Sequence, residues 1–155
     1  MRTSWAVILV SSLLAGGAFA ADAVGADCEP DRATSRSVNV TLDPLEGIRI
    51  AGVAVSLRYP ADKVTIPGRG PDVPAGTVTN TPAGAFAASF DTHGEFRQVI
   101  ARAEELAPGR LFTVRFAGCR GAEPAVAGDF ACAVTDASDD KTTQVEGARC
   151  RVLLD

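Results

Sequence analysis

Aromatic side chains are scarce in this chain: Phe, Trp and Tyr together make up 6% of its 155 residues. Its one tryptophan, Trp5, lies in an N-terminal segment that we expect to be removed, and its one tyrosine is Tyr59. Modules that bind crystalline polysaccharides stack sugar rings on exposed rows of Trp or Tyr, which offer a flat apolar face. The remaining chain cannot build such a row, so direct binding to a crystalline polysaccharide is disfavoured.

Clustered basic residues are also missing. The chain carries 15 Lys and Arg residues against 19 Asp and Glu residues, a formal net charge of −4. Because nucleic-acid binding needs a concentrated basic surface, we expect no nucleic-acid partner. Of the basic residues only Lys63 and Lys141 are lysines, and this arginine bias is typical of GC-rich bacterial genomes.

Residues that could carry catalysis are few. His93 is the only histidine, and a Ser-His-Asp site would have to use Ser89 and Asp91, its close neighbours in the sequence. Neighbours on one segment seldom converge as a triad, and no G-x-S-x-G surrounds Ser89. The chain has no C-x-x-C motif, which disfavours redox catalysis and a zinc site. We therefore expect a protein that is not an enzyme and holds no cofactor, and we rank a hydrolase lowest.

A secretory leader is present at the N-terminus. Residues 1–20 combine an early positive charge, the apolar run Ala6–Ala15 and the A-x-A cleavage motif Ala18-Phe19-Ala20. No later apolar run is long enough to cross a bilayer. We expect a mature protein without a membrane span, secreted or held in the periplasm or at the surface of a bacterial cell.

Period-two alternation of apolar side chains dominates the chain after a short flexible lead-in at 21–34, and it indicates half-buried β-strands. We assign 35–155 to one domain of about nine short strands separated by turn residues. Gly52 shifts the phase between Ile48 and Tyr59, which suggests a bulge within one long strand. The pattern predicts an all-β fold, an antiparallel β-sandwich or jelly roll. The phenylalanines expected in its core are Phe86, Phe112, Phe116 and Phe130.

The segment 95–106 fits two structures. Its apolar residues follow a helical spacing that would end at Pro108-Gly109. As a strand, Glu95–Arg102 would instead pair with Leu111–Ala117 through the Pro108-Gly109 region. We favour the strand, because the neighbouring segments are strands and tertiary context often overrides local propensity.

Four cysteines would enter the oxidising compartment that the leader predicts, where thiols pair. They allow three pairings, and sequence alone does not choose among them. Cys132 and Cys150 lie at equivalent phases of two strands that we expect to be adjacent, joined by a polar link. Adjacent antiparallel strands can bring two Cβ atoms within bridging distance, so we favour Cys132–Cys150, which leaves Cys28–Cys119. We expect both disulfides to be structural.

An acidic cluster between Cys132 and Cys150 offers oxygen ligands of the kind that calcium prefers. Asp136, Asp139 and Asp140 are the candidates, but they lack the residue order of an EF-hand. A polar hairpin loop is the simpler interpretation, so calcium stays a weak alternative.

A Pro- and Gly-rich loop, residues 67–74, places Arg69 at its tip. Protease inhibitors present rigid extended loops to their targets, so a protease inhibitor is our second hypothesis. An ordinary connecting loop is the simpler interpretation. A sequon at Asn39-Val40-Thr41 lies inside a predicted strand and matters only in a host that glycosylates such sites.

Three stretches resemble the cohesin-like branch of the carbohydrate-binding-module superfamily. The first is Gly52–Pro60, followed by Asp62 and Val64, which is similar to the family's apolar strand and its Tyr-Asp-Pro-like turn. The second is Gly94–Ala103, similar to a central strand after a glycine, and the third is Pro108–Phe116, similar to a glycine-led strand ending in Phe. The resemblance implies a jelly roll of about nine strands. It also implies non-catalytic recognition of a dockerin-like protein partner or of polysaccharide.

These observations favour a secreted, non-catalytic binding module. A protein partner in the extracellular space or envelope is favoured over polysaccharide, because the stacking aromatic residues are missing. A protease inhibitor and a direct carbohydrate-binding module remain the alternatives. Recognition by a sheet face would require an exposed patch with apolar residues at its centre.

Overall fold

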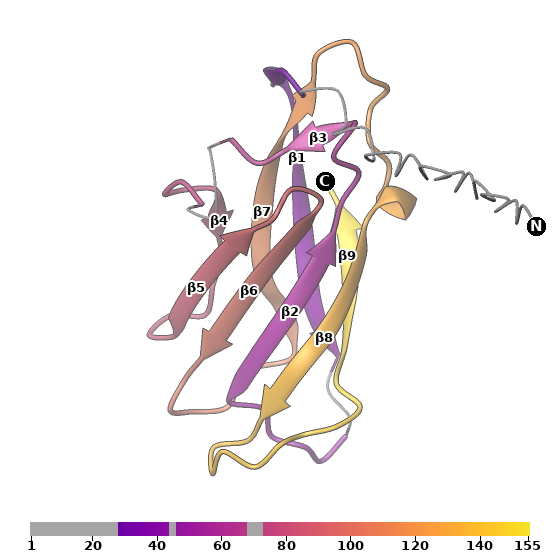
Figure 1. Ribbon diagram of the computed structural model, residues 1–155. Coiled ribbons are helices and arrows are strands. Elements are labelled where there is room, and N and C mark those ends of the chain that lie inside the picture. The colour runs from indigo at the N-terminus through magenta and orange to yellow at the C-terminus, as the bar shows by residue number, and fades with distance from the viewer. Residues whose placement is uncertain (1–27, 44–45, 68–72) are drawn as a thin grey trace, which may run out of the picture.

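The computed structural model describes residues 28–43, 46–67 and 73–155, and in these ranges the chain forms nine β-strands and one short 3-10 turn (Figure 1). The elements are β1 (Pro30–Asp43), β2 (Gly52–Arg58), β3 (Val64–Thr65), β4 (Val78–Thr79), β5 (Phe86–Asp91), β6 (Glu95–Ala101), β7 (Gly109–Cys119), η1 (Ala127–Asp129), β8 (Ala131–Ser138) and β9 (Arg149–Leu154). The expected all-β fold is confirmed.

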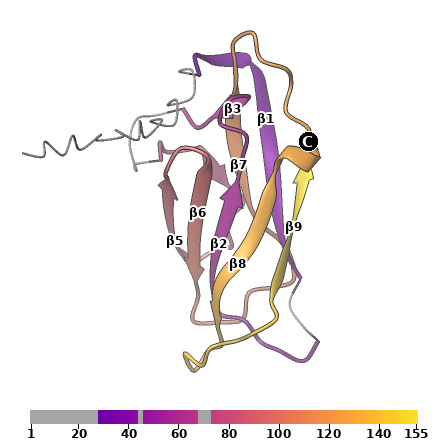
Figure 2. The same cartoon turned by 45° about the vertical axis from the view of Figure 1, so that its right-hand side comes forward.

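Two antiparallel sheets pack together as a sandwich (Figures 1 and 2). Sheet A has the strand order β3-β7-β1-β9, with β4 also paired to β7, and sheet B has the order β5-β6-β2-β8. Only β5 and β6 are neighbours both along the chain and in a sheet, so the chain crosses repeatedly between the two layers. The expectation of an antiparallel β-sandwich is therefore confirmed.

The core lies between the two sheets and follows the alternation seen in the sequence. In β6, for example, Phe96, Gln98 and Ile100 are buried, whereas Arg97 and Val99 between them are exposed. Burying one large apolar side chain contributes roughly 1.5–3 kcal/mol. The inward side chains of the other long strands that are at most 3% exposed are Val38, Val40, Leu42, Val53, Val55, Leu57, Phe112, Val114 and Phe116.

Tyr59 belongs to an aromatic cluster in this core. Its ring lies 4.9 Å from that of Phe116, and the ring of Phe116 lies 5.6 Å from that of Phe130. The Tyr59 hydroxyl donates a hydrogen bond of 2.8 Å to Asp91 Oδ1. Burial raises the pKa of Tyr59 well above its usual range, so this hydroxyl remains a donor at any physiological pH. The chain therefore presents no exposed tyrosine.

The expected long strand from Ile48 to Tyr59 is shorter in the structure. The strand β2 begins at Gly52, and residues 46–51 form a turn and an extended segment. The carbonyl of Ile50 accepts a 2.6 Å hydrogen bond from the Leu106 amide instead of pairing in a sheet. A Cβ atom at Gly52 would lie 2.7 Å from Ser138 Oγ, so glycine allows the close approach of β8 at this point.

The segment 95–106 contains a strand, as favoured, but its expected partner was wrong. Strand β6 pairs with β5 and β2 of sheet B, whereas Leu111–Ala117 belongs to β7 of sheet A. The reason is a two-residue turn, His93-Gly94, in which both residues have positive φ, 51° and 97°. Such turns close tight hairpins, so β6 folds back on β5 before the chain crosses to sheet A.

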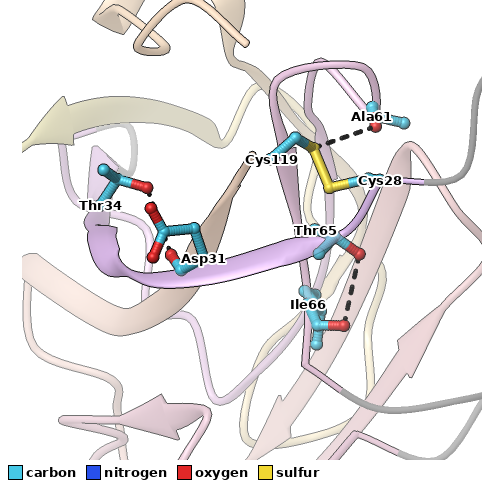
Figure 3. Close-up of a disulfide and its surroundings, with 7 residues drawn as sticks. All are labelled: Cys28, Asp31, Thr34, Ala61, Thr65, Ile66 and Cys119. Atoms are coloured by element: carbon cyan, nitrogen blue, oxygen red, sulfur yellow. Dashed lines mark hydrogen bonds between the residues drawn. A yellow bond between two sulfur atoms is a disulfide. The ribbon is translucent and has the colours of Figure 1, made fainter. Parts of the chain in front are cut away.

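The lead-in expected at 21–34 overlaps β1, which starts at Pro30 and pairs there with Cys119. The pairing is irregular between Asp31 and Arg36, where the Asp31 side chain accepts the Ala33 amide at 2.9 Å. Figure 3 shows this bend beside the disulfide Cys28–Cys119, which ties the start of β1 to the end of β7. The disulfide closes a sequence separation of 91 residues.

The second disulfide is Cys132–Cys150, which completes the pairing that we favoured. We expected the two strands that carry it to be paired with each other, and this expectation is wrong. Strand β8 pairs with β2 in sheet B and β9 pairs with β1 in sheet A, so this disulfide joins the two sheets along one side of the sandwich. Alternation identifies the inward face of a strand but not the sheet to which the strand belongs. The predicted disulfide is therefore correct, although the predicted pairing of its two strands is wrong.

Candidate functional site

The three residues of the hypothetical triad do not form a catalytic site. The hydroxyl of Ser89 donates a 2.6 Å hydrogen bond to Gln98 Oε1, and Asp91 accepts the Tyr59 hydroxyl. His93 is exposed in the turn between β5 and β6. Ser89 and Asp91 are thus each bonded to another side chain, and the triad hypothesis is not supported.

The acidic candidates for calcium are spread over the end of β8 and the loop that follows. Asp136 lies within β8, and Asp139 accepts the backbone amides of Lys141 at 2.9 Å and Thr143 at 2.7 Å. The Thr143 amide is the main reason why the pKa of Asp139 is below its usual value. Among the described residues, no three His, Cys, Asp or Glu side chains gather as a group that could hold a metal ion. Asp139 instead stabilises a polar loop.

Two candidate segments lie outside the described residues. They are the leader, residues 1–20, and residues 68–72 of the 67–74 loop, including Arg69. The signal peptide and the protease-inhibitor loop therefore stay predictions. No helix in the described part of the chain is long and apolar enough to cross a membrane.

The sequon residue Asn39 is only 2% exposed and is used inside sheet A. Its Nδ2 donates to Asp155 Oδ2 at 2.6 Å, and its Oδ1 accepts the Thr113 hydroxyl at 2.7 Å. Asn80 Nδ2 in turn donates to the Thr113 hydroxyl oxygen at 3.0 Å. This chain of hydrogen bonds occupies the amide of Asn39, so glycan attachment is incompatible with the folded sheet.

The outer face of sheet B carries an exposed apolar cluster on β5 and β6. Phe86 is 67% exposed, Phe90 is 48% exposed and Val99 is 36% exposed. In the β5–β6 register, Phe86 lies opposite Ala101 and Ala88 lies opposite Val99. Side chains that oppose one another in this way lie on one face of the sheet. We call these five residues the β5–β6 patch.

The patch continues onto small residues of the neighbouring strand β2. On β2, Gly52 lies opposite Ala101 and Ala54 lies opposite Val99, so neither raises a bulky side chain beside the patch. On the far side of β2, Ser56 pairs with the small Ala133 of β8. Charged side chains lie on either side of this pair, since Asp136 is opposite Ala54 and the exposed Arg58 is opposite Ala131. Figure 1 views sheet B from this outer face. A partner could therefore approach several strands at once.

A charged cluster borders the patch at the start of β6. Phe90 lies opposite Arg97, whose guanidinium binds Glu95 through contacts of 3.0 and 3.2 Å. Ser56 Oγ donates a further hydrogen bond of 2.7 Å to Glu95. The hydrogen bond from Arg97, followed by that from Ser56, holds the pKa of Glu95 below its usual value. The apolar patch thus has an ordered charged rim at neutral pH.

Most of the exposed large hydrophobic side chains in the described ranges belong to the β5–β6 patch. The other large hydrophobic residues that are exposed there are Val126, just before η1, and Leu153 on β9. Scattered single hydrophobic residues are normal on a protein surface, whereas a contiguous group marks an interaction site. The patch is therefore the best candidate for a functional surface.

The expectation that Phe86 lies in the core is wrong, because its side chain is 67% exposed on the outer face of sheet B. The stretch Phe86-Ala87-Ala88-Ser89-Phe90 did carry a signal, since alternation puts both phenylalanines on one face and Ala87 and Ser89 on the other. Small and polar residues are a poor inward face for a core strand. That contrast could have identified β5 as a strand with its large side chains directed outward.

An open pocket of about 220 Å³ lies behind β5, between its inner face and residues 73–78. Gln98 of β6 reaches this pocket and is 1% exposed, although it occupies an inward position that is usually apolar. Its partner is Ser89, and Ala87 and Val78 also line the pocket. The inner face of β5 is therefore partly open, and Ala87 on this face is exposed.

Comparisons with known proteins add no relative to this picture. No family model matches the chain, and no similar curated protein or solved structure was found.

Proposed function

We propose that this protein is a secreted, non-catalytic binding module that recognises an extracellular or envelope protein through the outer face of sheet B. The observation that carries this proposal is the β5–β6 patch, an exposed apolar group beside the small residues Gly52 and Ala54 of β2. Interface centres are apolar and depleted in charge, with polar residues at the rim. The patch and its Glu95–Arg97 border have this composition.

The two phenylalanines would supply most of the binding energy. Covering one large apolar side chain contributes roughly 1.5–3 kcal/mol, and aromatic anchors dominate many interfaces. Phe86 and Phe90 are more exposed than any other phenylalanine in the described ranges. They are also held by strand pairing rather than by a loop, so little ordering is needed on binding.

A protein partner is favoured over a polysaccharide by what surrounds the patch. Sugar sites combine a stacking ring with hydrogen-bonding groups that match the hydroxyls. Phe86, Ala88, Val99 and Ala101 form an apolar group without a polar side chain. The polar side chain nearest Phe90 is that of Arg97, which is already bound to Glu95. Tyr59 is buried in the core. The cohesin-like resemblance, which implies a dockerin-like protein partner or polysaccharide, stays a prediction.

The secreted location belongs to the same proposal. Two disulfides in one small domain agree with an oxidising compartment, where such bonds persist. The predicted leader at residues 1–20 supplies the route to that compartment.

A comparative pull-down tests the proposed function. The oxidised protein, the variant Phe86→Ser/Phe90→Ser and the control Leu153→Ser would be immobilised and exposed to secreted and envelope proteins of the source organism. Insoluble polysaccharides would be tested in parallel. The control removes one exposed hydrophobic residue from sheet A, so it matches the change in surface character.

We expect one protein to be retained at moderate salt by the unmodified protein and by Leu153→Ser. The double variant should retain at least about tenfold less, because two anchors are lost. Equal retention by the double variant would show that another surface binds. Retention on polysaccharide alone would show that the ligand class is wrong.

A further inference from the structure

The four sheet edges of the sandwich differ in how they are protected. In sheet A, one edge is formed by β3 and β4, each two residues long, and the other by β9, which carries Arg149 and Arg151. In sheet B, the β8 edge has an irregular register beside Ala54 and is tied to β9 by a disulfide. Short strands, charges and bulges are the usual ways in which proteins prevent edge-to-edge pairing.

Strand β5 is neither very short nor bulged, and its one charged residue, Asp91, lies at its end. Its six residues, Phe86–Asp91, contain no proline and no basic residue, and their pairing with β6 is regular throughout. Figures 1 and 2 show β5 at the border of sheet B with no strand of that sheet beyond it. Such an edge is a template for pairing with another strand.

The backbone groups that face this edge follow from the hairpin. The Thr92 amide donates to the Glu95 carbonyl at 3.0 Å, which makes Thr92 and Glu95 a hydrogen-bonded pair. Antiparallel pairs alternate between hydrogen-bonded and non-hydrogen-bonded, so Phe86, Ala88 and Phe90 bond to β6. The N–H and C=O groups of the intervening residues 87, 89 and 91 therefore point to the edge. No turn or loop hydrogen bond within the described ranges uses them.

We propose that β5 pairs antiparallel with β5 of a second copy of this chain, about a two-fold axis that passes through Ala88. The sequence Phe86-Ala87-Ala88-Ser89-Phe90 is nearly palindromic about its central residue. A two-fold axis at Ala88 places Phe86 of each copy opposite Phe90 of the other, and Ala87 opposite Ser89. This register keeps every side chain on the face that it already occupies.

The proposed register also satisfies the free backbone groups. Ala87 and Ser89 of the other copy become hydrogen-bonded pairs, which gives about four new backbone hydrogen bonds across the axis. Phe86 and Phe90 become non-hydrogen-bonded pairs, in which side chains approach most closely. Two Phe–Phe contacts then lie on the outer face, and the small Ala88 side chains meet at the axis.

Charge does not oppose this arrangement. Asp91 is the one charged residue of β5, and it would lie opposite the uncharged Ala85 of the second copy. Its carboxylate is held on the inner face by the Tyr59 hydroxyl at 2.8 Å. The pairing would unite two copies of sheet B into a continuous eight-stranded sheet that presents two β5–β6 patches side by side.

The size of the interface sets the expected affinity. A strand of six residues spans about 20 Å, so the pairing buries less surface than a standard interface. We therefore expect a weak, reversible dimer whose population rises with protein concentration. This proposal is independent of the proposed function, because dimerisation can be measured without any partner.

Sedimentation equilibrium between 10 μM and 1 mM tests the dimer on the oxidised protein. The variant Ala87→Pro removes one edge-facing N–H and leaves the bonds to β6, while Ala87→Ser keeps the N–H as a matched control. We expect the unmodified protein and Ala87→Ser to dimerise alike, and the proline variant to dimerise at least tenfold more weakly. A monomer at every concentration, or a dimer unchanged by Ala87→Pro, would overturn the proposal.

Cysteine cross-linking tests the position of the axis. At a non-hydrogen-bonded pair on a two-fold axis, the two Ala88 Cα atoms lie within disulfide range. Under a glutathione buffer, Ala88→Cys should form a disulfide-linked dimer at least tenfold more readily than Ala54→Cys on the central strand β2. Mass mapping would verify the two native disulfides in each variant. Equal cross-linking of both variants would place the axis elsewhere and overturn the register.

Discussion

The two sides of this sandwich differ in how their strands are held. On the β8 side, a disulfide joins β8 to β9 across the sheets and the strand register is interrupted. On the β5 side, the strand edge is unprotected, an open pocket lies behind it, and Phe86 and Phe90 face outward. A disulfide therefore joins the two sheets on the β8 side, whereas the residues that the structure describes show no such bond on the β5 side.

Removing the inter-sheet disulfide should have the largest effect on stability. The variant Cys132→Ser/Cys150→Ser opens a loop with a sequence separation of 18 residues. The free energy of unfolding should fall by about 3 kcal/mol, since the unfolded chain is no longer constrained. Urea denaturation measures the loss. The patch variant Phe86→Ser/Phe90→Ser should change the same quantity by less than about 0.5 kcal/mol, because both rings are exposed. Similar losses for the two variants would contradict this difference between the two sides.

A smaller loss is expected at Gln98 on the β5 side. The variant Gln98→Met keeps the side-chain volume but removes the acceptor of the Ser89 hydroxyl. We expect a destabilisation of about 1 kcal/mol, because water in the open pocket can replace the lost hydrogen bond. Thermal or urea unfolding of Gln98→Met, beside Ser89→Ala as the partner deletion, measures it. A loss as large as that of the disulfide variant would mean that the β5 side is tightly closed.

The smallest effect concerns the charged rim of the patch. Arg97 and Ser56 lower the pKa of Glu95 from its ordinary value of 4.5 in the folded state. A lowered folded pKa stabilises the protein above the unfolded pKa, and that contribution disappears as the pH falls through the folded pKa. The stability difference between the unmodified protein and Glu95→Gln should therefore be constant near pH 7 and vanish well below pH 4.5. A difference that grows on acidification would contradict the assigned contacts.

Local patterns in the sequence predicted more of the fold than of the site. Alternation identified β1, β2 and β7, because the inward face of a strand is a local property. It did not reveal which strands share a sheet, so β6 was paired with β7 and the strands of Cys132 and Cys150 were thought adjacent. Sheet membership depends on crossings between distant segments.

The candidate site was missed for a related reason. A phenylalanine within an alternating run usually faces the core, but the inward positions of β5 are taken by Ala87 and Ser89, so Phe86 faces outward. The pairing of β6 likewise depends on two residues outside the strand, since the turn at His93-Gly94 folds β6 back on β5. Asn39 shows the opposite case. A sequon marks an accessible side chain, but Asn39 is buried in sheet A, where its amide is hydrogen-bonded to Asp155.

Hydrogen exchange on the complex with the retained protein tests the central claim most directly. The unmodified protein would be labelled alone and with its partner, and the protection of each segment would be compared. We predict that protection concentrates in residues 86–101, which include β5 and β6. Protection confined to β9 and β1 on sheet A, with none in β5 and β6, would contradict the account.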